Sequence, residues 1–391
     1  MYLEKTKSRI GEKVRISHVQ ERVEAYLPPL LPPNPPINME TLRSKLEKAY
    51  LFIGRLDGIS EVLPDFSIFV YTYVRQEAVF SSQIEGTQSS LSDLFLFEID
   101  HPPSVPIDEI QEVSNYVSAM NHGITRLNQG FPLSQRLMRE MHEILLSGGR
   151  GSSKLPGEFR RSQNWIGGTR PGNAMYVPPP HTYIADLMSD IETFIHSDHH
   201  ELPTLMKAGL IHVQFETIHP FLDGNGRLGR LLITLYLVHS GLLQHPTLNL
   251  SLYFKHYRSH YYELLQRVRT HGDWETWLGF FLDGVIETSE HGIQLAKNIL
   301  KLFDEDIQKI NHSGRLAGSA LQVFSILQKQ FIISAPYISK TAGISLPTAY
   351  KSIHHLEKLG VMKEITGQRR NRIFVYDKYL QLLTESIASS S

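Results

Sequence analysis

A stretch of twelve residues, His219 to Arg230, contains most of the side chains whose types and spacing could do chemistry. It reads HPFLDGNGRLGR and holds one imidazole, one carboxylate, a Gly-Asn-Gly turn and two arginines. The apolar run at 231–237 predicts a buried helix, so the turn lies at a helix N-terminus. Free backbone N–H groups at such a terminus attract anions, and glycines let the backbone approach them closely. The stretch therefore predicts a phosphate site.

The charged side chains of this stretch extend that prediction. Arg227 and Arg230 are three residues apart, so both guanidinium groups lie on one face of the first helical turn and can bind successive phosphates. Asp223 would repel phosphate unless a cation such as Mg²⁺ lay between them. His219, with an ordinary pKa of about 6.5, is suited to removing a proton from a hydroxyl. Together these residues predict phosphoryl or nucleotidyl transfer.

Other interpretations of the same residues are weaker. A Gly-x-Gly turn or a single histidine is by itself more often structural than functional. His212, Glu216 and His219 could bind zinc, but their spacing is not His-Glu-x-x-His. The chain has no Gly-Lys-Ser/Thr loop of the Walker type.

At every position the twelve residues resemble the signature of the Fic (Fic/Doc) family, His-x-Phe-x-Asp/Glu-Gly-Asn-Gly-Arg-x-x-Arg. Members of that family mostly transfer AMP from ATP to a protein hydroxyl. The resemblance implies that His219 activates the hydroxyl, that Asp223 binds Mg²⁺ and that Phe221 anchors the loop in the core. It further implies nucleotide binding by Gly224, Asn225, Gly226, Arg227 and Arg230, the last at the γ-phosphate.

A second informative stretch is the apolar helical pattern over residues 65–85, which ends at Gly86. Glu85 then lies in the last turn, where a carboxylate opposes the helix dipole by about 0.3–1 kcal/mol, so it is either solvated or paired with a cation. The sequence SSQIEG resembles the Fic inhibitory motif Ser/Thr-x-x-x-Glu-Gly/Asn, in the class whose inhibitory helix precedes the core. The resemblance implies that Ser81 and Glu85 are inhibitory. Glu85 would pair with Arg230 in competition with the γ-phosphate.

Two further segments resemble parts of Fic proteins. Glycine and proline cluster over residues 148–180 and predict a short β-hairpin with a mobile tip, similar to the Fic flap, whose edge receives the target by strand addition. A target protein would dock near 167–178. The aromatic-rich segment 252–265 resembles the lining of the adenosine pocket, so Tyr261 and Tyr262 are candidate nucleotide contacts, although at least one is expected to pack in the core.

Composition restricts the class of protein. The 391 residues suffice for two or three domains with sizeable cores. A net charge of −1 gives no global field toward nucleic acid or membrane. The absence of cysteine excludes disulfides and thiolate metal sites and fits a reducing cytosol. No apolar run approaches the ~20 residues of a membrane span, and the N-terminus lacks a signal-peptide core. We expect a cytoplasmic protein with no membrane partner.

The expected fold class is mainly α: a Fic-type helical core with a short β-hairpin flap, plus a C-terminal winged-helix domain. The predicted limits are an N-terminal arm and helical region with the inhibitory helix at 1–107, the catalytic core at 108–303, a linker at 304–318 and the winged helix-turn-helix at 319–391. Proline-rich residues 27–36 predict an extended, packed arm. Apolar periodicity predicts helices near 39–60, 108–127, 134–146, 183–197, 202–216 and 274–302.

The last eighty residues predict a separate small domain. Helices near 320–329, 336–342 and 346–359, followed by strand-like 361–365 and 372–376, resemble a winged helix-turn-helix. Residues 345–376 hold six Lys or Arg against two Glu. The segment therefore predicts DNA binding, with protein docking or dimerisation equally open. The side chains expected to face outward are Thr348, Tyr350, Lys351 and His354 on the third helix and Arg369, Arg370 and Arg372 on the wing.

The resulting functional prediction is a protein adenylyltransferase with ATP as substrate and Mg²⁺ as cofactor. Its target is a Ser, Thr or Tyr hydroxyl of a protein, including the chain itself, and Glu85 inhibits it by pairing with Arg230. One alternative keeps the site and removes AMP from a modified target, with Glu85 orienting a water. A third hypothesis is a DNA-binding regulator whose core only senses nucleotide. A homodimer is also open.

Overall fold

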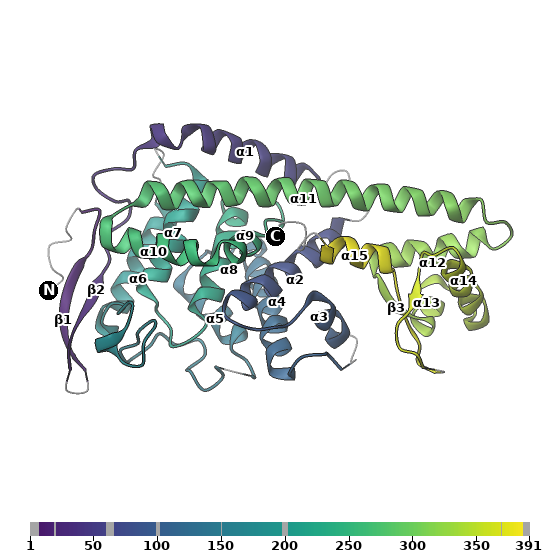
Figure 1. Ribbon diagram of the computed structural model, residues 1–391, viewed down its shortest axis with the longest axis horizontal. Coiled ribbons are helices and arrows are strands. Elements are labelled where there is room, and N and C mark those ends of the chain that lie inside the picture. Colours follow the sequence, from purple (N-terminus) through teal and green to yellow (C-terminus); the bar gives the residue numbers. More distant parts are fainter. Residues whose placement is uncertain are drawn as a thin grey trace. The chain divides into compact units, whose positions relative to one another are not determined.

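The structure is a computed structural model that describes residues 8–18, 21–59, 66–98, 102–149, 151–197, 202–368 and 370–385. The chain forms two compact units (Figure 1). The first contains Met1–Gly54 and Val74–Thr288, and the second contains Arg55–Tyr73 and Ser289–Ser391. Most described residues are helical, so the prediction of a mainly α chain is confirmed.

The first unit is built around two helices, α7 (Thr204–Ile218) and α8 (Asn225–His239), which pack against each other (Figure 1). Every residue of α7 after Thr204 is buried, and nearly all of α8 is buried as far as Leu237. Helices that are apolar all round belong in the centre of a bundle. Helices α4 (Ile107–Asn128), α5 (Gln135–Leu145), α6 (Ile184–His196) and α10 (Arg258–His271) pack on this pair. The signature therefore lies at the loop between the two central helices.

Three other helices occur where helices were predicted: α1 (Arg43–Gly58), α2 (Phe66–Ile84) and α11 (Trp274–Asn311), the last of which runs past its predicted end at 302. All three have residues in the second unit as well. Helices α3 (Leu91–Glu98) and α9 (Leu250–His256) were not predicted. Helix α2 ends before Gly86, whose φ of +107° favours glycine. The stop predicted at Gly86 is thus confirmed, and Glu85 follows the last helical residue.

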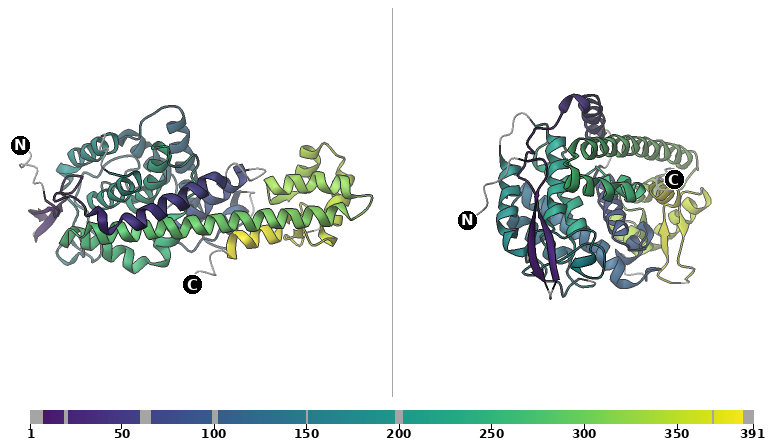
Figure 2. Two further views of the ribbon diagram at one scale, coloured as in Figure 1. Left: turned by 90° about the horizontal axis from the view of Figure 1, so that it is seen from above. Right: turned by 60° about the vertical axis from the view of Figure 1, so that its left-hand side comes forward.

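An N-terminal β-hairpin was not predicted. Strands β1 (Glu12–His18) and β2 (Glu21–Leu27) pair antiparallel, with Glu12 opposite Leu27 at the open end of the hairpin. Figure 2 shows them as a two-stranded ribbon. Val23 and Ala25, two residues apart and therefore on one face of β2, bury themselves against Val177. The extended arm predicted at 27–36 follows this hairpin.

The segment predicted as the flap, which we call the flap and define as residues 162–179, contains less strand than expected. Among its residues one isolated antiparallel bridge joins Ile166 to Tyr176. Gly167 and Gly168 have positive φ, and a single 3₁₀ turn, η3 (Pro171–Asn173), occupies the tip. Prolines at 171 and 178–180 cannot donate to a ladder, so the pairing cannot lengthen. A hairpin-like loop replaces the predicted β-hairpin.

The second unit contains the predicted three helices and terminal strands. They are α12 (Ala317–Lys329), α13 (Ala335–Ala342), α14 (Leu346–Lys358), β4 (Lys363–Glu364) and β5 (Ile373–Val375). A strand that was not predicted, β3 (Ile332–Ser334), completes an antiparallel sheet of order β3-β5-β4, and a helix that was also not predicted, α15 (Asp377–Glu385), follows it. Of the predicted wing residues, Arg369 lies outside the described residues.

The predicted linker at 304–318 is helical for its first half, because α11 continues to Asn311. Asp306 is fully buried and accepts a hydrogen bond of 2.7 Å from the hydroxyl of Tyr376, while the Phe303 ring stacks on the Tyr376 ring. Asp306 and Ile310, the buried residues of the segment 304–311, are therefore part of the core of the second unit. The predicted boundary at 303/304 falls inside one continuous helix whose buried stripe does not stop there.

Among the described residues, no helix combines the length and the apolar character needed to cross a bilayer.

The contact between Asp306 and Tyr376 can be tested by substitution. Tyr376→Phe leaves one oxygen of a buried carboxylate without its donor, so we expect the free energy of unfolding to fall by about 1–3 kcal/mol. Urea unfolding measures the loss, and Tyr337→Phe, at a tyrosine that is 41% exposed, is the matched control. Equal effects of the two changes would show that residues 304–311 behave as a linker.

Candidate active site

The turn that carries His219 has a backbone that few side chains adopt. His219 caps the C-terminus of α7 in the left-handed region, with φ 50° and ψ 60°, and its N–H bonds to the Phe215 carbonyl at 2.9 Å. A left-handed conformation costs a non-glycine residue about 1–2 kcal/mol, so the surrounding contacts must hold it. Arg160 does so by donating from Nε to the His219 carbonyl at 2.9 Å.

Two further contacts fix the loop that follows. The Phe221 side chain is fully buried, as the family resemblance implied, and its ring stacks on His142 with centroids 3.7 Å apart. The Asn225 side chain bonds both the N–H and the carbonyl of Phe221 at 2.9 Å. Asn225 thus closes the turn, and its side chain is used for loop structure.

The imidazole of His219 is in a form that can accept a proton. Burial lowers its pKa well below the ordinary 6.5, and the positive charges of Arg269 and Arg160 lower it further, against an opposing effect of Glu85. A histidine with a depressed pKa is neutral at physiological pH. Its neutral form is the one that general-base chemistry requires.

The predicted anion site, the backbone from Gly224 to Gly226, lies at the N-terminus of α8. Gly224 has φ 77°, which favours glycine, and the helix begins at Asn225. A Cβ added at Gly226 would collide with the carboxylate of Glu85. The space in front of the helix N-terminus is therefore already occupied by an anion, which is the Glu85 side chain.

Arg230 joins the two predicted inhibitory residues. Its Nε donates to the Ser81 hydroxyl and one terminal nitrogen donates to the Ser81 carbonyl, both at 2.8 Å, while the same nitrogen lies 2.7 Å from Glu85 Oε1. The Arg230 side chain is 1% exposed and the Glu85 side chain 33%. Burial alone would raise the pKa of Glu85, but the charge and hydrogen bond of Arg230 outweigh it and lower that pKa. The pair is ionised, and its acidic partner is the one accessible to solvent.

Arg227 has a carboxylate partner that was not predicted. Glu112 on α4 lies 3.0 Å from it, and both side chains are almost completely buried, at 3% and 2% exposure. Asp223 lies farther away, at 3.6 Å. A signal existed in the sequence, because Glu112 falls among the buried positions of α4 next to Val113 and four residues before Tyr116.

Asp223, the predicted Mg²⁺ ligand, is about one-third exposed, and its Oδ1 accepts the N–H of Gly224 at 2.6 Å. His142, another residue that was not predicted, orients it. Nδ1 of His142 accepts the Gly157 N–H at 2.9 Å, so Nε2 carries the proton and donates to the Asp223 carbonyl at 2.9 Å. Mg²⁺ needs only one or two protein carboxylates when phosphate and water supply its other ligands. One accessible carboxylate beside the anion site fits such an ion.

The two candidate tyrosines differ in their exposure to solvent. Tyr261 is completely buried, and its hydroxyl lies 2.9 Å from Nε2 of His212. It is a core residue and offers no free ring face, as was expected of at least one of the pair. Tyr262 is 41% exposed, so its ring is accessible to a ligand. Tyr262 therefore remains the candidate nucleotide contact.

A zinc site is not formed by His212, Glu216 and His219. Both ring nitrogens of His212 are occupied, Nδ1 by the Gly229 carbonyl at 3.0 Å and Nε2 by Tyr261. Glu216 faces Gly229 instead, where a Cβ would collide with its carboxylate, and burial raises the pKa of Glu216 to about 7. In the described part of the chain no three His, Cys, Asp or Glu converge as metal ligands.

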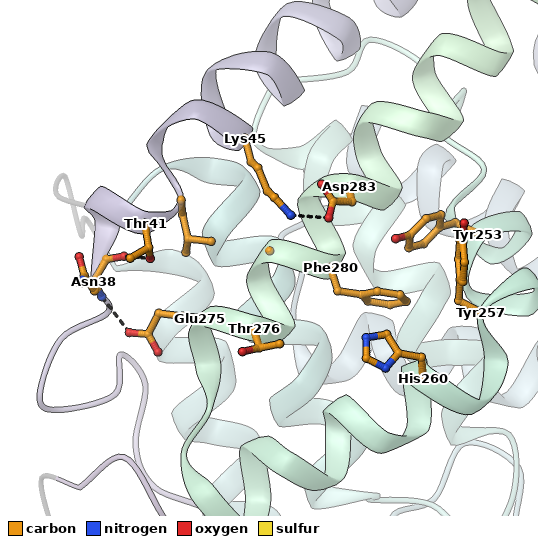
Figure 3. Close-up of a pocket in the computed structure, with 12 residues that line it drawn as sticks. Asn38, Thr41, Lys45, Tyr253, Tyr257, His260, Glu275, Thr276, Phe280 and Asp283 are labelled. Atoms are coloured by element: carbon orange, nitrogen blue, oxygen red, sulfur yellow. Dashed lines mark hydrogen bonds and ion pairs between the residues drawn. The ribbon is translucent and has the colours of Figure 1, made fainter.

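A separate pocket of about 800 Å³ is lined by residues of α9, α10 and α11 and by residues from the segment 38–45 (Figure 3). Its aromatic side is formed by Tyr253, Tyr257, His260 and Phe280, and its polar side holds the ion pair of Lys45 with Asp283 at 2.5 Å. None of the signature residues lines it. It is not part of the candidate active site.

Two segments of the chain match the profiles of known protein families. Residues 43–125 match the profile described as Fic/DOC family N-terminal, and residues 132–237 match the profile described as Fic/DOC family. A protein adenylyltransferase Fic from Drosophila virilis is 33% identical over 178 residues, 45% of this chain and 33% of the relative. That from Drosophila melanogaster is 32% identical over 229 residues, 58% of this chain and 43% of the relative. The chain thus spans less than half the length of these relatives.

Solved structures show the same fold. A Fic family protein from Desulfovibrio desulfuricans superposes with a TM-score of 0.55 at 18% identity, over 86% of this chain and 95% of that one. Fic-1 from C. elegans superposes with a TM-score of 0.50 at 23% identity, over 67% and 74%. The predicted Fic-type helical fold is confirmed.

Glu112 and Glu85, the carboxylates nearest to Arg227 and Arg230, should differ in their effect on stability. Glu112→Gln removes the nearer counter-charge of a fully buried guanidinium and is expected to cost about 3–5 kcal/mol. Glu85→Gln should cost much less, because solvent reaches that carboxylate and Ser81 still binds Arg230. Urea unfolding of both variants measures the difference. Equal losses in the free energy of unfolding would contradict the view that Glu112 is a fixed partner and Glu85 a releasable one.

Proposed function

Residues 43–125 and 132–237 belong to the Fic/DOC family, and on that basis we propose that this chain is a protein adenylyltransferase. It transfers AMP from ATP to a Ser, Thr or Tyr hydroxyl of a protein. The observation that carries the proposal is the arrangement at the start of α8. A neutral histidine, a helix N-terminus and two buried arginines surround a space that the Glu85 carboxylate now fills.

The reaction uses these groups in order. The His219 imidazole accepts the proton of the target hydroxyl, whose oxygen forms a bond to the α-phosphorus while the bond from that phosphorus to the pyrophosphate oxygen breaks. Pyrophosphate leaves with its charge held by the N–H groups of Gly224 to Gly226 and by Arg227 and Arg230. The products are the AMP-modified target, pyrophosphate and a proton on His219, which solvent removes.

Mg²⁺ fits this site beside Asp223, with phosphate and water as its remaining ligands. Bound there, it neutralises phosphate charge. Asp223 is held for that role by the hydrogen bond of His142 to its carbonyl and by the Gly224 N–H on its carboxylate.

Inhibition in this proposal is a competition between two anions for Arg230. The γ-phosphate and the Glu85 carboxylate need the same guanidinium, and the carboxylate also lies over Gly226. Productive ATP binding therefore requires Glu85 to leave. It can do so because Arg230 then gains phosphate as its partner.

The target is proposed to dock on the flap, near residues 167–178, with the chain itself as one target. Strand β2 already bonds one side of the flap, since the Tyr26 N–H donates to the Val177 carbonyl at 3.0 Å. A target backbone would add at the opposite side, which contains Gly167. The Asn164 side chain connects that side to the catalytic loop through the Phe221 carbonyl at 3.1 Å.

Self-labelling with α-³²P-ATP tests the proposal. We expect weak label in the unmodified chain, at least about tenfold more after Glu85→Gly, and none after His219→Ala. The increase follows because a charge-assisted hydrogen bond of about 1.5–3 kcal/mol no longer competes with the nucleotide. Gln83→Gly, on the same helical turn, controls for loosening of α2. Label that survives His219→Ala would refute the assignment of the base.

The same variants distinguish the opposite reaction. If Glu85 orients a water that removes AMP, a pre-labelled target should release AMP with the unmodified chain and not with Glu85→Gly.

For the C-terminal unit we propose a winged helix that binds DNA. On α14 the side chains of Tyr350, Lys351 and His354 are exposed, and Arg370 is exposed beside the strands. Thr348 is only partly exposed, because its hydroxyl lies 2.8 Å from that of Ser345. Arg372 is partly covered by the Phe374 ring and lies 3.9 Å from Glu357. The exposed groups offer two cations and an aromatic side chain to a phosphate backbone.

DNA binding should depend on salt through these cations. Lys351→Ala with Arg370→Ala is expected to weaken duplex binding and to reduce the slope of log K against log[salt] by about 2, one for each lost phosphate contact. Fluorescence anisotropy over a salt series measures both. Lys297→Ala on α11 is a control that removes one exposed positive charge, and it should leave both quantities unchanged. Binding that depends neither on salt nor on the double change would favour a protein-docking domain instead.

A further inference from the structure

Two arginines outside the signature contact the backbone that carries His219. Arg160 is 2% exposed and Arg269 is 7% exposed. Arg160 donates to the His219 carbonyl at 2.9 Å and to the Ile218 carbonyl at 3.5 Å. Arg269 donates to the Glu216 carbonyl and to the Thr217 hydroxyl, both at 3.2 Å. Together they bind four consecutive residues at the end of α7.

Each of these arginines also contacts the flap. Arg160 donates to the Pro179 carbonyl at 2.5 Å and to the Ser162 carbonyl at 3.1 Å, the two ends of the flap. The guanidinium of Arg269 lies 3.9 Å from the ring centroid of Tyr176, whose hydroxyl donates to the Thr217 carbonyl at 2.7 Å. The flap and the catalytic turn are therefore joined through the same two side chains.

The choice of arginine follows from this geometry. A guanidinium is planar and has five N–H donors in a fixed arrangement, so one side chain can bond carbonyls on both sides of it. A lysine ammonium has three donors at one point and cannot span the same separation. Burying a charged group against carbonyl oxygens costs free energy. Two buried guanidinium groups beside His219 therefore indicate that the position of this histidine must be held accurately.

We propose that Arg160 and Arg269 are positioning residues that set the distance between the flap, where the target backbone docks, and the His219 base. The inference rests on the proposed adenylyl transfer. It adds that the clamp, as we name this pair of arginines, acts on the target hydroxyl and not on the nucleotide. The nucleotide is instead held by Arg227 and Arg230, whose side-chain partners are Glu112, Asp223, Ser81 and Glu85.

The test compares neighbouring arginines in the Glu85→Gly background. Arg160→Lys keeps the positive charge and removes the planar set of guanidinium donors. We expect the kcat of self-labelling to fall about 10- to 100-fold, because small misplacements of a reacting group have effects of that size. The KM for ATP should stay within about twofold of the parent value. Arg161→Lys is the matched control, since the Arg161 side chain is 80% exposed, and it should label normally. Arg269→Lys should resemble Arg160→Lys.

The pH dependence of the rate distinguishes the effect of the arginine charges on His219 from their effect on its position. The charged groups that act on His219 are Arg269, Arg160 and Glu85. Replacing either arginine with glutamine removes a positive charge, raises the pKa of His219 and moves the acid limb of the rate profile to higher pH. The lysine variants keep the charge, so their acid limb should stay in place while kcat falls. A merely structural role would not produce this difference.

The outcomes are distinguishable. Equal kcat for Arg160→Lys and Arg161→Lys, or a raised KM for ATP at unchanged kcat, overturns the clamp. If Arg160→Lys fails to fold, Tyr176→Phe decides the matter. It removes one hydroxyl bond between flap and turn and should lower kcat by a smaller factor, and unchanged kcat there overturns the clamp. No label in the Glu85→Gly parent would refute the adenylyltransferase itself, and the clamp with it.

Discussion

Two arginines in the first turns of a buried helix cannot stay there without negative charge, and much of the active site follows from that requirement. A buried guanidinium without a counter-charge costs on the order of several kcal/mol. Glu112 satisfies Arg227 from a fully covered position, whereas Glu85 satisfies Arg230 from a position that solvent reaches. The fold thus supplies one anion that is fully covered and one that solvent reaches, and under the proposed function a phosphate replaces the second. Autoinhibition in this view is the state in which the chain supplies both anions itself.

The second constraint is the left-handed backbone at His219, which places an imidazole at the edge of the anion site. This turn is held from several directions: Arg160 on its carbonyl, Asn225 around Phe221, and His142 against the Phe221 ring. Burial lowers the pKa of this histidine, and the charges of Arg269 and Arg160 lower it further and keep the ring neutral. Arg160 therefore contributes both to the geometry of the turn and to the protonation state of the histidine.

Much of this arrangement was predictable from sequence because its parts are local. The signature, the i and i+4 spacing of Ser81 and Glu85, and the glycine that ends their helix all lie within short stretches. Glu112, His142, Arg160 and Arg269 were not predicted, because their partners are tens of residues away along the chain. The β1–β2 hairpin does show alternation, with Val14 and Ile16 opposite Ala25 and Val23, but its burial depends on the distant Val177. Continuity of α11 through the predicted linker depended on Tyr376 in the same way.

One helix has residues in both compact units. The first part of α2, through Tyr73, belongs with the C-terminal unit, and the remainder, with Ser81, belongs with the signature. A helix of 19 residues rises about 28 Å, and backbone hydrogen bonds join its turns along that length. Ser81, which binds Arg230, therefore lies on the same continuous helix as residues that belong to the other compact unit.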